Sequence, residues 1–305
     1  MLFKGSSAVK LENELLSVIV LPSIGGKVAS IYKKDKNFEL LFQNKEDHYT
    51  KPSLYKAFEE YDAAGFDDAF PTIDSCIVSY NNKEILYPDH GEIWSGEFQY
   101  KMEGELLYLE YHSQILDYEY TKTLSLEGEN LVCRYSILNT GNDSFPFIWA
   151  FHCLVKCEED MELFFPRGTE KVITVQNSNM LGAVGTIHTY PITRNLQGEA
   201  YSLNRVLPAS FQNTEKYYVS GMVQEGSCGI YYPNQDVRYT LYFDKKKLPY
   251  LGFWVTEGGF RGDYNCDLEP TNGYYDDIHI AAKNQSLCFL EPAQPFVFEI
   301  RIELK

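Results

Sequence analysis

Short β-like runs that end in turn residues recur along most of the chain, and this pattern constrains the fold more than any other feature of the sequence. Three neighbouring pairs of runs have the spacing of hairpins, at residues 76–80 and 84–87, 97–102 and 106–112, and 118–126 and 131–138. The Asn81-Asn82 pair between the first two runs is typical of a two-residue hairpin turn. Similar runs occur at 16–21, 28–32, 145–151, 237–243, 250–255, 287–290 and 296–302.

The remaining features of the sequence agree with a chain built from strands. Helical periodicity is nearly absent, and only one short helix is expected, at residues 52–61. Aromatic residues make up 15% of the chain, with 24 Tyr and 19 Phe, and such side chains favour pleated strands. No repeat, low-complexity tract or linker divides the 305 residues. We therefore predict an all-β fold, a large antiparallel β-sandwich in which residues 1–305 form a single domain.

The net charge of −16 narrows the classes of partner. This charge repels phosphate backbones and anionic lipid, so neither nucleic acid nor a membrane is an expected partner, whereas an uncharged sugar is not repelled. No stretch approaches the roughly 20 apolar residues of a membrane span, and the first residues have no apolar signal-like core. A cytoplasmic location is therefore expected. The sequence does not predict an oligomeric state.

The seven cysteines indicate free thiols rather than a disulfide framework. Their number is odd, and no paired CxxC motifs occur. His152, Cys153 and Cys157 together weakly resemble a zinc site, but the rest of the chain contains no further ligands at the expected spacing. Buried thiols in a reducing compartment are the favoured interpretation, so neither a metal nor a cofactor is predicted.

Three segments place titratable side chains beside apolar runs. In the first, residues 87–94, Pro and Gly form a turn that would present His90 at a strand edge, with Trp94 as an aromatic face for a sugar ring. The alternative is that Asp89 and His90 only satisfy hydrogen bonds within the turn.

In the second segment, residues 145–152, His152 ends an apolar strand, where burial would move its pKa towards or below neutrality. The alternative is a core histidine bonded to a carbonyl group.

The third segment, residues 267–277, contains Glu269 between a strand and a Thr-Asn-Gly turn. A carboxylate held there beside apolar Leu268 could act as a general base. The alternative is a solvated loop carboxylate, with Asp276 and Asp277 as ordinary turn residues.

Together and in this order, these segments resemble the aldose 1-epimerase (galactose mutarotase-like) family, and the similarity spans nearly the whole chain. The resemblance implies the supersandwich fold of that family and a cofactor-free isomerase (mutarotase) of carbohydrate metabolism. By the same resemblance, Glu269 is the catalytic base, His152 the proton donor to the ring oxygen, and His90 a sugar-binding residue. The matching motifs are His90-Gly91 followed by Trp94, Pro146 with His152 six residues later, Leu268-Glu269 before Asp276-Asp277, and Leu21-Pro22 with Gly25-Gly26 and Ile31.

The chain departs from typical galactose mutarotases at the sugar-gripping arginine. That family carries an Asn-Arg-Ile segment, whereas the corresponding residues 65–74 contain no arginine. The family's aspartate that binds the substrate hydroxyls has no evident counterpart either. Lys216 is a candidate site residue with a role different from that of the aspartate. These departures place the chain in a less characterised branch of the family and leave the sugar undefined.

Substrate contacts are expected from further polar and aromatic side chains. The adjacent carboxylates of Asp67 and Asp68 could accept hydrogen bonds from sugar hydroxyls, although the pair could also cap a helix, bind calcium or lie on the surface. The Trp254 ring could stack on a sugar, and the alternative is an ordinary position in the core. The predicted substrate-binding residues are His90, Asp67, Asp68, Trp94, Trp254, Lys216 and Arg261, and Asp74 is a further candidate.

Three other functions stay open at this point. The main alternative is a non-catalytic carbohydrate-binding protein on the same fold, which the missing arginine favours. A polysaccharide hydrolase or lyase is the second, since Asp-rich loops could furnish two carboxylates around a glycosidic bond. A purely structural protein comes last, because it would not explain the polar clusters.

Overall fold

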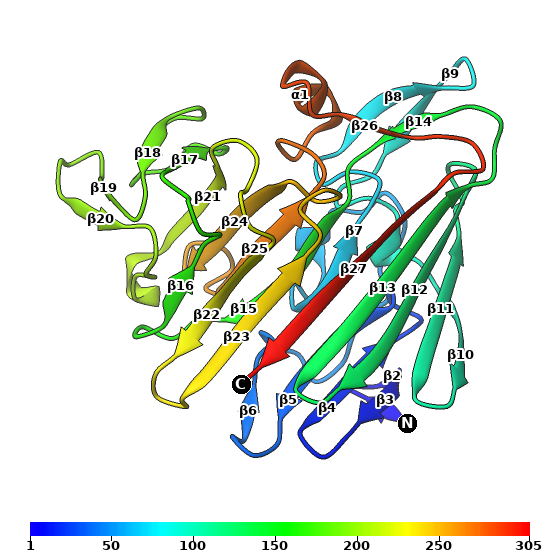
Figure 1. Ribbon diagram of the computed structural model, residues 1–305, viewed down its shortest axis with the longest axis horizontal. Coiled ribbons are helices and arrows are strands. Elements are labelled where there is room, and N and C mark those ends of the chain that lie inside the picture. Colours follow the sequence, from blue (N-terminus) through cyan, green and yellow to red (C-terminus); the bar gives the residue numbers. More distant parts are fainter.

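Two large antiparallel sheets form the body of the protein in the computed structural model, which describes residues 1–305. Figure 1 shows the strands of the first sheet lying side by side across the front of the molecule. In spatial order this eight-stranded sheet consists of β10 (Gln99–Glu103), β11 (Leu106–His112), β12 (Tyr118–Glu127), β13 (Asn130–Asn139), β27 (Pro295–Leu304), β23 (Val237–Phe243), β22 (Ser227–Tyr232) and β16 (Glu162–Phe164).

The second sheet has eleven strands and positions the candidate site. Its spatial order is β18 (Ile187–Thr189), β17 (Lys171–Thr174), β21 (Asn213–Val219), β24 (Tyr250–Glu257), β25 (Tyr264–Thr271), β15 (Ala150–Lys156), β7 (Gly65–Ala69), β5 (Lys27–Lys33), β4 (Leu16–Leu21) and β3 (Val9–Glu12), with β6 (Phe38–Glu39) beside β5. Short hairpins and strand pairs complete the fold: β1 (Leu2–Phe3) with β2 (Ser6–Ser7), β8 (Cys76–Tyr80) with β9 (Lys83–Tyr87), β14 (Phe145–Phe147) with β26 (Cys288–Leu290), and β19 (Ile192–Arg194) with β20 (Ala200–Ser202).

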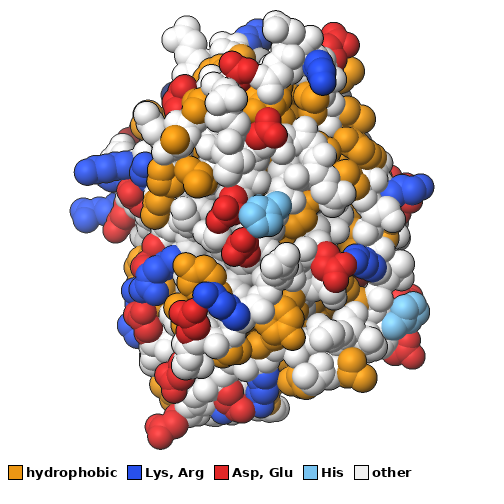
Figure 2. Space-filling view, turned by 90° about the vertical axis from the view of Figure 1, so that its right-hand side faces the viewer, with side chains coloured by type: hydrophobic (Ala, Val, Ile, Leu, Met, Phe, Trp, Pro, Cys, Tyr) orange, Lys and Arg blue, Asp and Glu red, His pale blue; other side chains and the backbone are white.

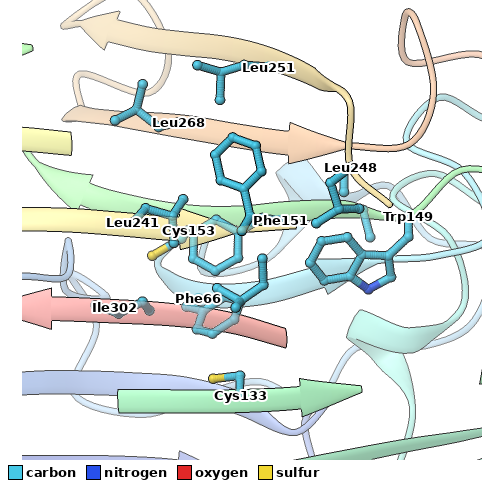
Figure 3. Close-up of a cluster of buried hydrophobic side chains, with 14 of the residues drawn as sticks. Phe66, Cys133, Trp149, Phe151, Cys153, Leu241, Leu248, Leu251, Leu268 and Ile302 are labelled. Atoms are coloured by element: carbon cyan, nitrogen blue, oxygen red, sulfur yellow. The ribbon is translucent and has the colours of Figure 1, made fainter. Parts of the chain in front are cut away.

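The core lies between the two large sheets. Alternating side chains on each strand point to opposite faces, so each sheet presents one apolar face to the other. Figure 3 shows side chains from both sheets meeting there: Cys133 on β13 and Ile302 on β27 approach Phe66 on β7 and Phe151 on β15. All four are fully buried. The strands of both sheets pair antiparallel, which confirms the antiparallel, all-β prediction.

The three predicted hairpins are present. The first, β8 to β9, turns through Asn81 and Asn82, whose φ angles of 52° and 57° are left-handed as this turn requires. The connection between β12 and β13 is shorter than predicted, because pairing continues to Glu127 and Asn130.

The predicted helix at residues 52–61 is wrong. Only a 3-10 turn, Phe58–Glu60, forms there, and positive φ angles at Tyr55 (67°) and Ala63 (47°) interrupt a helical backbone on both sides. Other 3-10 turns are Ile93–Ser95 and Ala209–Phe211. The structure contains one α-helix, α1 (Ile278–Lys283). No helix has the length and apolar character needed to span a membrane.

The predicted strand 145–151 divides into two strands in different sheets. β14 ends at Phe147 and β15 begins at Ala150, while the Asn272 side chain accepts a 2.6 Å hydrogen bond from the Trp149 backbone N–H at the break. His152 is therefore the third residue of β15 and lies inside a strand, not at the end of one.

Charged side chains of both signs are interspersed on the face that carries the β10 edge. Figure 2 shows this face, on which acidic, basic and hydrophobic side chains alternate without one sign gathering in a single patch. The net acidic charge therefore does not mark this face as a binding surface for an ionic partner.

Candidate functional site

A cleft of about 580 Å³ opens on the face of the eleven-stranded sheet that points away from the core. Its volume lies within the range of typical small-molecule sites. The cleft brings together five of the residues predicted for the site from separate stretches of sequence: His90, His152, Lys216, Trp254 and Glu269. Its other titratable lining residues are Glu59, Asp74, Asp89 and Asp276.

Strand alternation explains why the polar side chains gather on this face. On β25, Leu268 packs into the core between the sheets, so its neighbours Asp267 and Glu269 project to the opposite face. On β15, Phe151 and Cys153 point into the core, which turns His152 to the cleft side. β25 and β15 are neighbouring strands, so the carboxylates and the imidazole lie close together.

Glu269 lies on the floor of the cleft and pairs with Lys216. The Lys216 Nζ is 3.2 Å from Glu269 Oε2 and 2.9 Å from Asp276 Oδ2, so one ammonium group joins two carboxylates. Burial raises the pKa of Glu269, and Lys216 opposes that rise. Glu269 is only 2% exposed, and its Oε2 has no hydrogen-bond partner apart from the Lys216 ammonium, so the carboxylate keeps lone pairs for a ligand hydroxyl.

His152 is packed among aromatic rings. Its ring lies edge-on to Phe58 at 4.9 Å and to His90 at 4.9 Å between centroids. Burial lowers the pKa of His152 well below its usual value, and the nearby His90 and Lys216 add to this effect. The direction agrees with the sequence prediction. The Nδ1 atom has no hydrogen-bond partner, which contradicts the alternative of a core histidine bonded to a carbonyl group through this nitrogen.

His90 is held by its neighbour Asp89 and by Phe58. Its Nδ1 is 2.9 Å from Asp89 Oδ1, while the other carboxylate oxygen accepts a 2.7 Å hydrogen bond from the Phe58 backbone N–H. The Phe58 ring stacks on the His90 ring at 4.5 Å between centroids. Burial raises the pKa of Asp89, but the bonds from His90 and Phe58 outweigh it and lower the pKa overall. The turn hydrogen bonds thus fix an imidazole that still faces the cleft.

Asp67 and Asp68 do not line the cleft, contrary to the prediction. They are consecutive residues of β7, so their side chains project from opposite faces of the sheet. Asp67 pairs with buried Lys27, whose Nζ is 2.6 Å from Oδ2. Asp68 points between the sheets, where Lys122 Nζ lies 3.0 Å from Oδ2. Both carboxylates are almost fully buried and already paired, so neither is a surface pair or a sugar ligand.

The predictions for Trp94 and Arg261 also need correction. Trp94 is buried beneath Phe58 and Tyr61, and its indole N–H donates to the Asp89 carbonyl oxygen, so it supports the His90 turn from behind. Arg261 lies outside the cleft, where its guanidinium donates to the backbone carbonyl of Tyr61. The guanidinium therefore links two loops at the rim. Trp254 does line the cleft, and its ring packs edge-on against Phe260 at 5.9 Å.

One residue of the site was not predicted as a ligand. Asp276, read as an ordinary turn residue, accepts a 2.5 Å hydrogen bond from the Tyr218 hydroxyl and pairs with Lys216. Asp74 lines the cleft, and burial together with the nearby Asp276 raises its pKa to about 6. The contacts of Asp276 join elements more than fifty residues apart, so no local sequence pattern predicts them.

Three neighbouring side chains, two of which line the cleft, have the composition of a metal site. His152, Asp267 and Glu269 each place one donor atom within 4.8 Å of the others. The Lys216 ammonium, however, already lies 3.2 Å from Glu269 Oε2. A cation at this oxygen would be repelled by the lysine, so the donor set fits a proton-transfer site better than a metal site.

The fold is that of galactose mutarotase-like proteins. The Slr1438 protein of Synechocystis sp. PCC 6803 superposes with a TM-score of 0.72 at 16% identity, over 98% of this chain and 96% of that one. An Escherichia coli K12 protein provisionally named an aldose 1-epimerase gives 0.70 at 16% identity, over 98% and 99%. A galactose mutarotase-like protein of Lactobacillus casei ATCC 334 gives 0.70 at 16% identity, over 98% and 100%.

The sequence comparisons place the chain more narrowly than these structures do. No curated protein is significantly similar to it. The profile of a family described as a domain of unknown function, DUF5107, matches residues 4–284. The match covers most of the chain, and the protein therefore belongs to the DUF5107 family and has a galactose mutarotase-like fold.

Proposed function

We propose that the protein is an aldose 1-epimerase, which interconverts the α and β anomers of a free sugar in this cleft. The observation that supports the proposal most directly is the placement of Glu269 and His152. They project from neighbouring strands into one sugar-sized cleft, where His152 Nδ1 has no hydrogen-bond partner and Glu269 Oε2 has none apart from the Lys216 ammonium. The cleft thus offers a proton acceptor and a proton donor to the same ligand.

The reaction needs two proton transfers around one carbon–oxygen bond. Glu269 accepts the proton of the anomeric hydroxyl, and the O1–H electron pair forms the C1=O1 double bond. The C1–O5 bond breaks, its electron pair moves to O5, and O5 takes a proton from His152. Rotation about the C1–C2 bond and reversal of both transfers then close the ring on the other face and restore both residues.

The surroundings of the two residues suit these roles. Lys216 favours the ionised form of Glu269, which a base requires. A His152 imidazolium in so buried a position gives up its proton readily, because burial disfavours the charged form. Each acid–base group typically contributes about 10²–10⁴-fold, which is enough for a reaction that already proceeds in water.

The experiment is the exchange rate between α and β anomers, measured by NMR for a panel of free hexoses, pentoses and sugar phosphates. We expect acceleration by the protein and a loss of about 10²–10⁴-fold in Glu269→Gln. Glu225→Gln is the matched control, because it makes the same change at an exposed carboxylate outside the cleft. No acceleration with any sugar, together with saturable ligand shifts, would replace the enzyme by a carbohydrate-binding protein.

A further inference from the structure

We infer that Lys216 is a positioning residue that keeps Glu269 ionised, held for this task between Glu269 and Asp276. The inference deepens the proposed epimerase function and rests on it. It assigns Lys216 an action through the base, whereas the sequence suggested contact with the sugar.

The fold gives Lys216 a path to Glu269 across an intervening strand. Lys216 lies on β21 and Glu269 on β25, with β24 between them. The β24 residue that pairs with Glu269 is Gly252. A Cβ atom at Gly252 would lie 2.9 Å from Glu269 Oε2, so a side chain at this position would occupy the space beside the carboxylate. The glycine leaves that space to the Glu269 carboxylate and the Tyr218 ring, so the carboxylate can stay where Lys216 reaches it.

A second carboxylate anchors the ammonium on its other side. Asp276 Oδ2 is 2.9 Å from Lys216 Nζ, and the Tyr218 hydroxyl donates to Asp276 Oδ1 at 2.5 Å. The Lys216 side chain is only 12% exposed, so water screens the two ion pairs weakly. The two ion pairs thus hold the Lys216 ammonium in a fixed position between Glu269 and Asp276.

The charges around Glu269 show why the lysine is needed. Asp267 and Asp276 both disfavour a third negative charge, and burial disfavours it further. Lys216 is the one cation paired directly with Glu269, since His90 is paired with Asp89. The titratable groups that face Glu269 from the surrounding elements are Lys216, Tyr218, Asp267, Asp276, Asp74, His90 and His152.

The chemical consequence concerns the first proton transfer. A protonated Glu269 cannot accept the anomeric proton. The pKa of Glu269 is raised even with Lys216 present, and without Lys216 it would rise further, so the site would work only at a higher pH. Lys216 thereby extends the activity towards lower pH. Arginine can supply the same charge, but methionine cannot.

The test compares Lys216→Met and Lys216→Arg with the wild-type protein, using Lys283→Met as a control. That control removes the same charge at an exposed helical position. The carboxyl group of Glu269 is titrated by NMR after ¹³C labelling of glutamate, and its resonance is assigned by its absence in Glu269→Gln. The same variants are assayed for anomer exchange between pH 4 and 9.

We expect Lys216→Met to raise the Glu269 midpoint by at least one pH unit and to move the acidic limb of kcat/KM by the same amount. At a pH below both midpoints this is at least a tenfold loss. Lys216→Arg should keep the wild-type limb, and KM should change less than kcat at low pH. An unchanged Glu269 midpoint in Lys216→Met would overturn the inference.

Two further outcomes separate this inference from the proposed function. If the wild-type protein exchanges no anomers, the epimerase proposal fails, whereas the NMR titration still decides the role of Lys216. If Lys216→Met does not fold, Lys216→Gln keeps a hydrogen-bonding side chain of similar length without the charge, and the same midpoint shift is required of it.

Discussion

Two buried lysine–carboxylate pairs in this protein have the same chemistry and different surroundings. Lys122 and Asp68 meet between the sheets, where both side chains are fully buried and Tyr135 donates to the second carboxylate oxygen at 3.0 Å. Lys216 and Glu269 meet in the cleft, where both side chains border open space and the lysine also pairs with Asp276. The difference teaches that burial of an ion pair does not identify a site, whereas its position in the lining of a cleft does.

The largest effect on stability is expected from Lys122→Met. It leaves the Asp68 carboxylate buried without its cation, and removal of one partner of such a pair typically lowers the free energy of unfolding by about 3–5 kcal/mol. Denaturant unfolding measures the loss. The Lys216→Met variant supplies the comparison, since its side chain borders open space and should be destabilised less. Equal losses in the two variants would contradict the distinction between the pairs.

A smaller effect is expected from pH, and it concerns only the cleft pair. Activity requires ionised Glu269 and protonated His152, so it rises as Glu269 loses its proton and falls as His152 loses its own. The pKa of Glu269 is raised and that of His152 is lowered well below 6.5, which brings the two limbs together. We expect a narrow, bell-shaped profile of kcat/KM centred below pH 7. A broad plateau extending to pH 9 would sink the assignment of His152 as the acid.

The smallest effect is expected from Gly252→Ala. The added Cβ would lie 2.9 Å from Glu269 Oε2 and 3.0 Å from the Tyr218 ring, so the carboxylate or the ring must shift. We expect a loss of about 1–3 kcal/mol in unfolding free energy. Anomer exchange should fall less than in Glu269→Gln. A variant with wild-type exchange and wild-type Glu269 titration would show that the pair tolerates displacement.

Much of the fold was predictable because its signals are local. The Asn81-Asn82 turn and the alternation along strands such as β12 identify antiparallel hairpins from neighbouring residues alone. His90, His152 and Glu269 were also predicted, since each lies beside an apolar run with a recognisable motif, and the structure brings them into one cleft. Their catalytic roles stay predictions.

The remainder of the site depends on contacts between distant segments, which local sequence patterns do not predict. Residues 65–69, with two adjacent aspartates, do not look like a strand, so the alternation that separates Asp67 from Asp68 was not anticipated. The link from Lys216 through Asp276 to Tyr218 depends on the order of strands in the sheet, and that order is not encoded in any short segment.

The turn that carries His90 also determines how freely this protein can vary in evolution. Gly91, Gly104 and Gly128 all have left-handed backbones, with φ angles of 74°, 63° and 60°. Space surrounds the two hairpin glycines, whereas a Cβ at Gly91 would lie 2.1 Å from the carbonyl oxygen of Phe70. Asparagine, which tolerates this backbone, is therefore an admissible replacement at 104 and 128 but not at 91. In a saturation library selected for function, position 91 should return glycine alone.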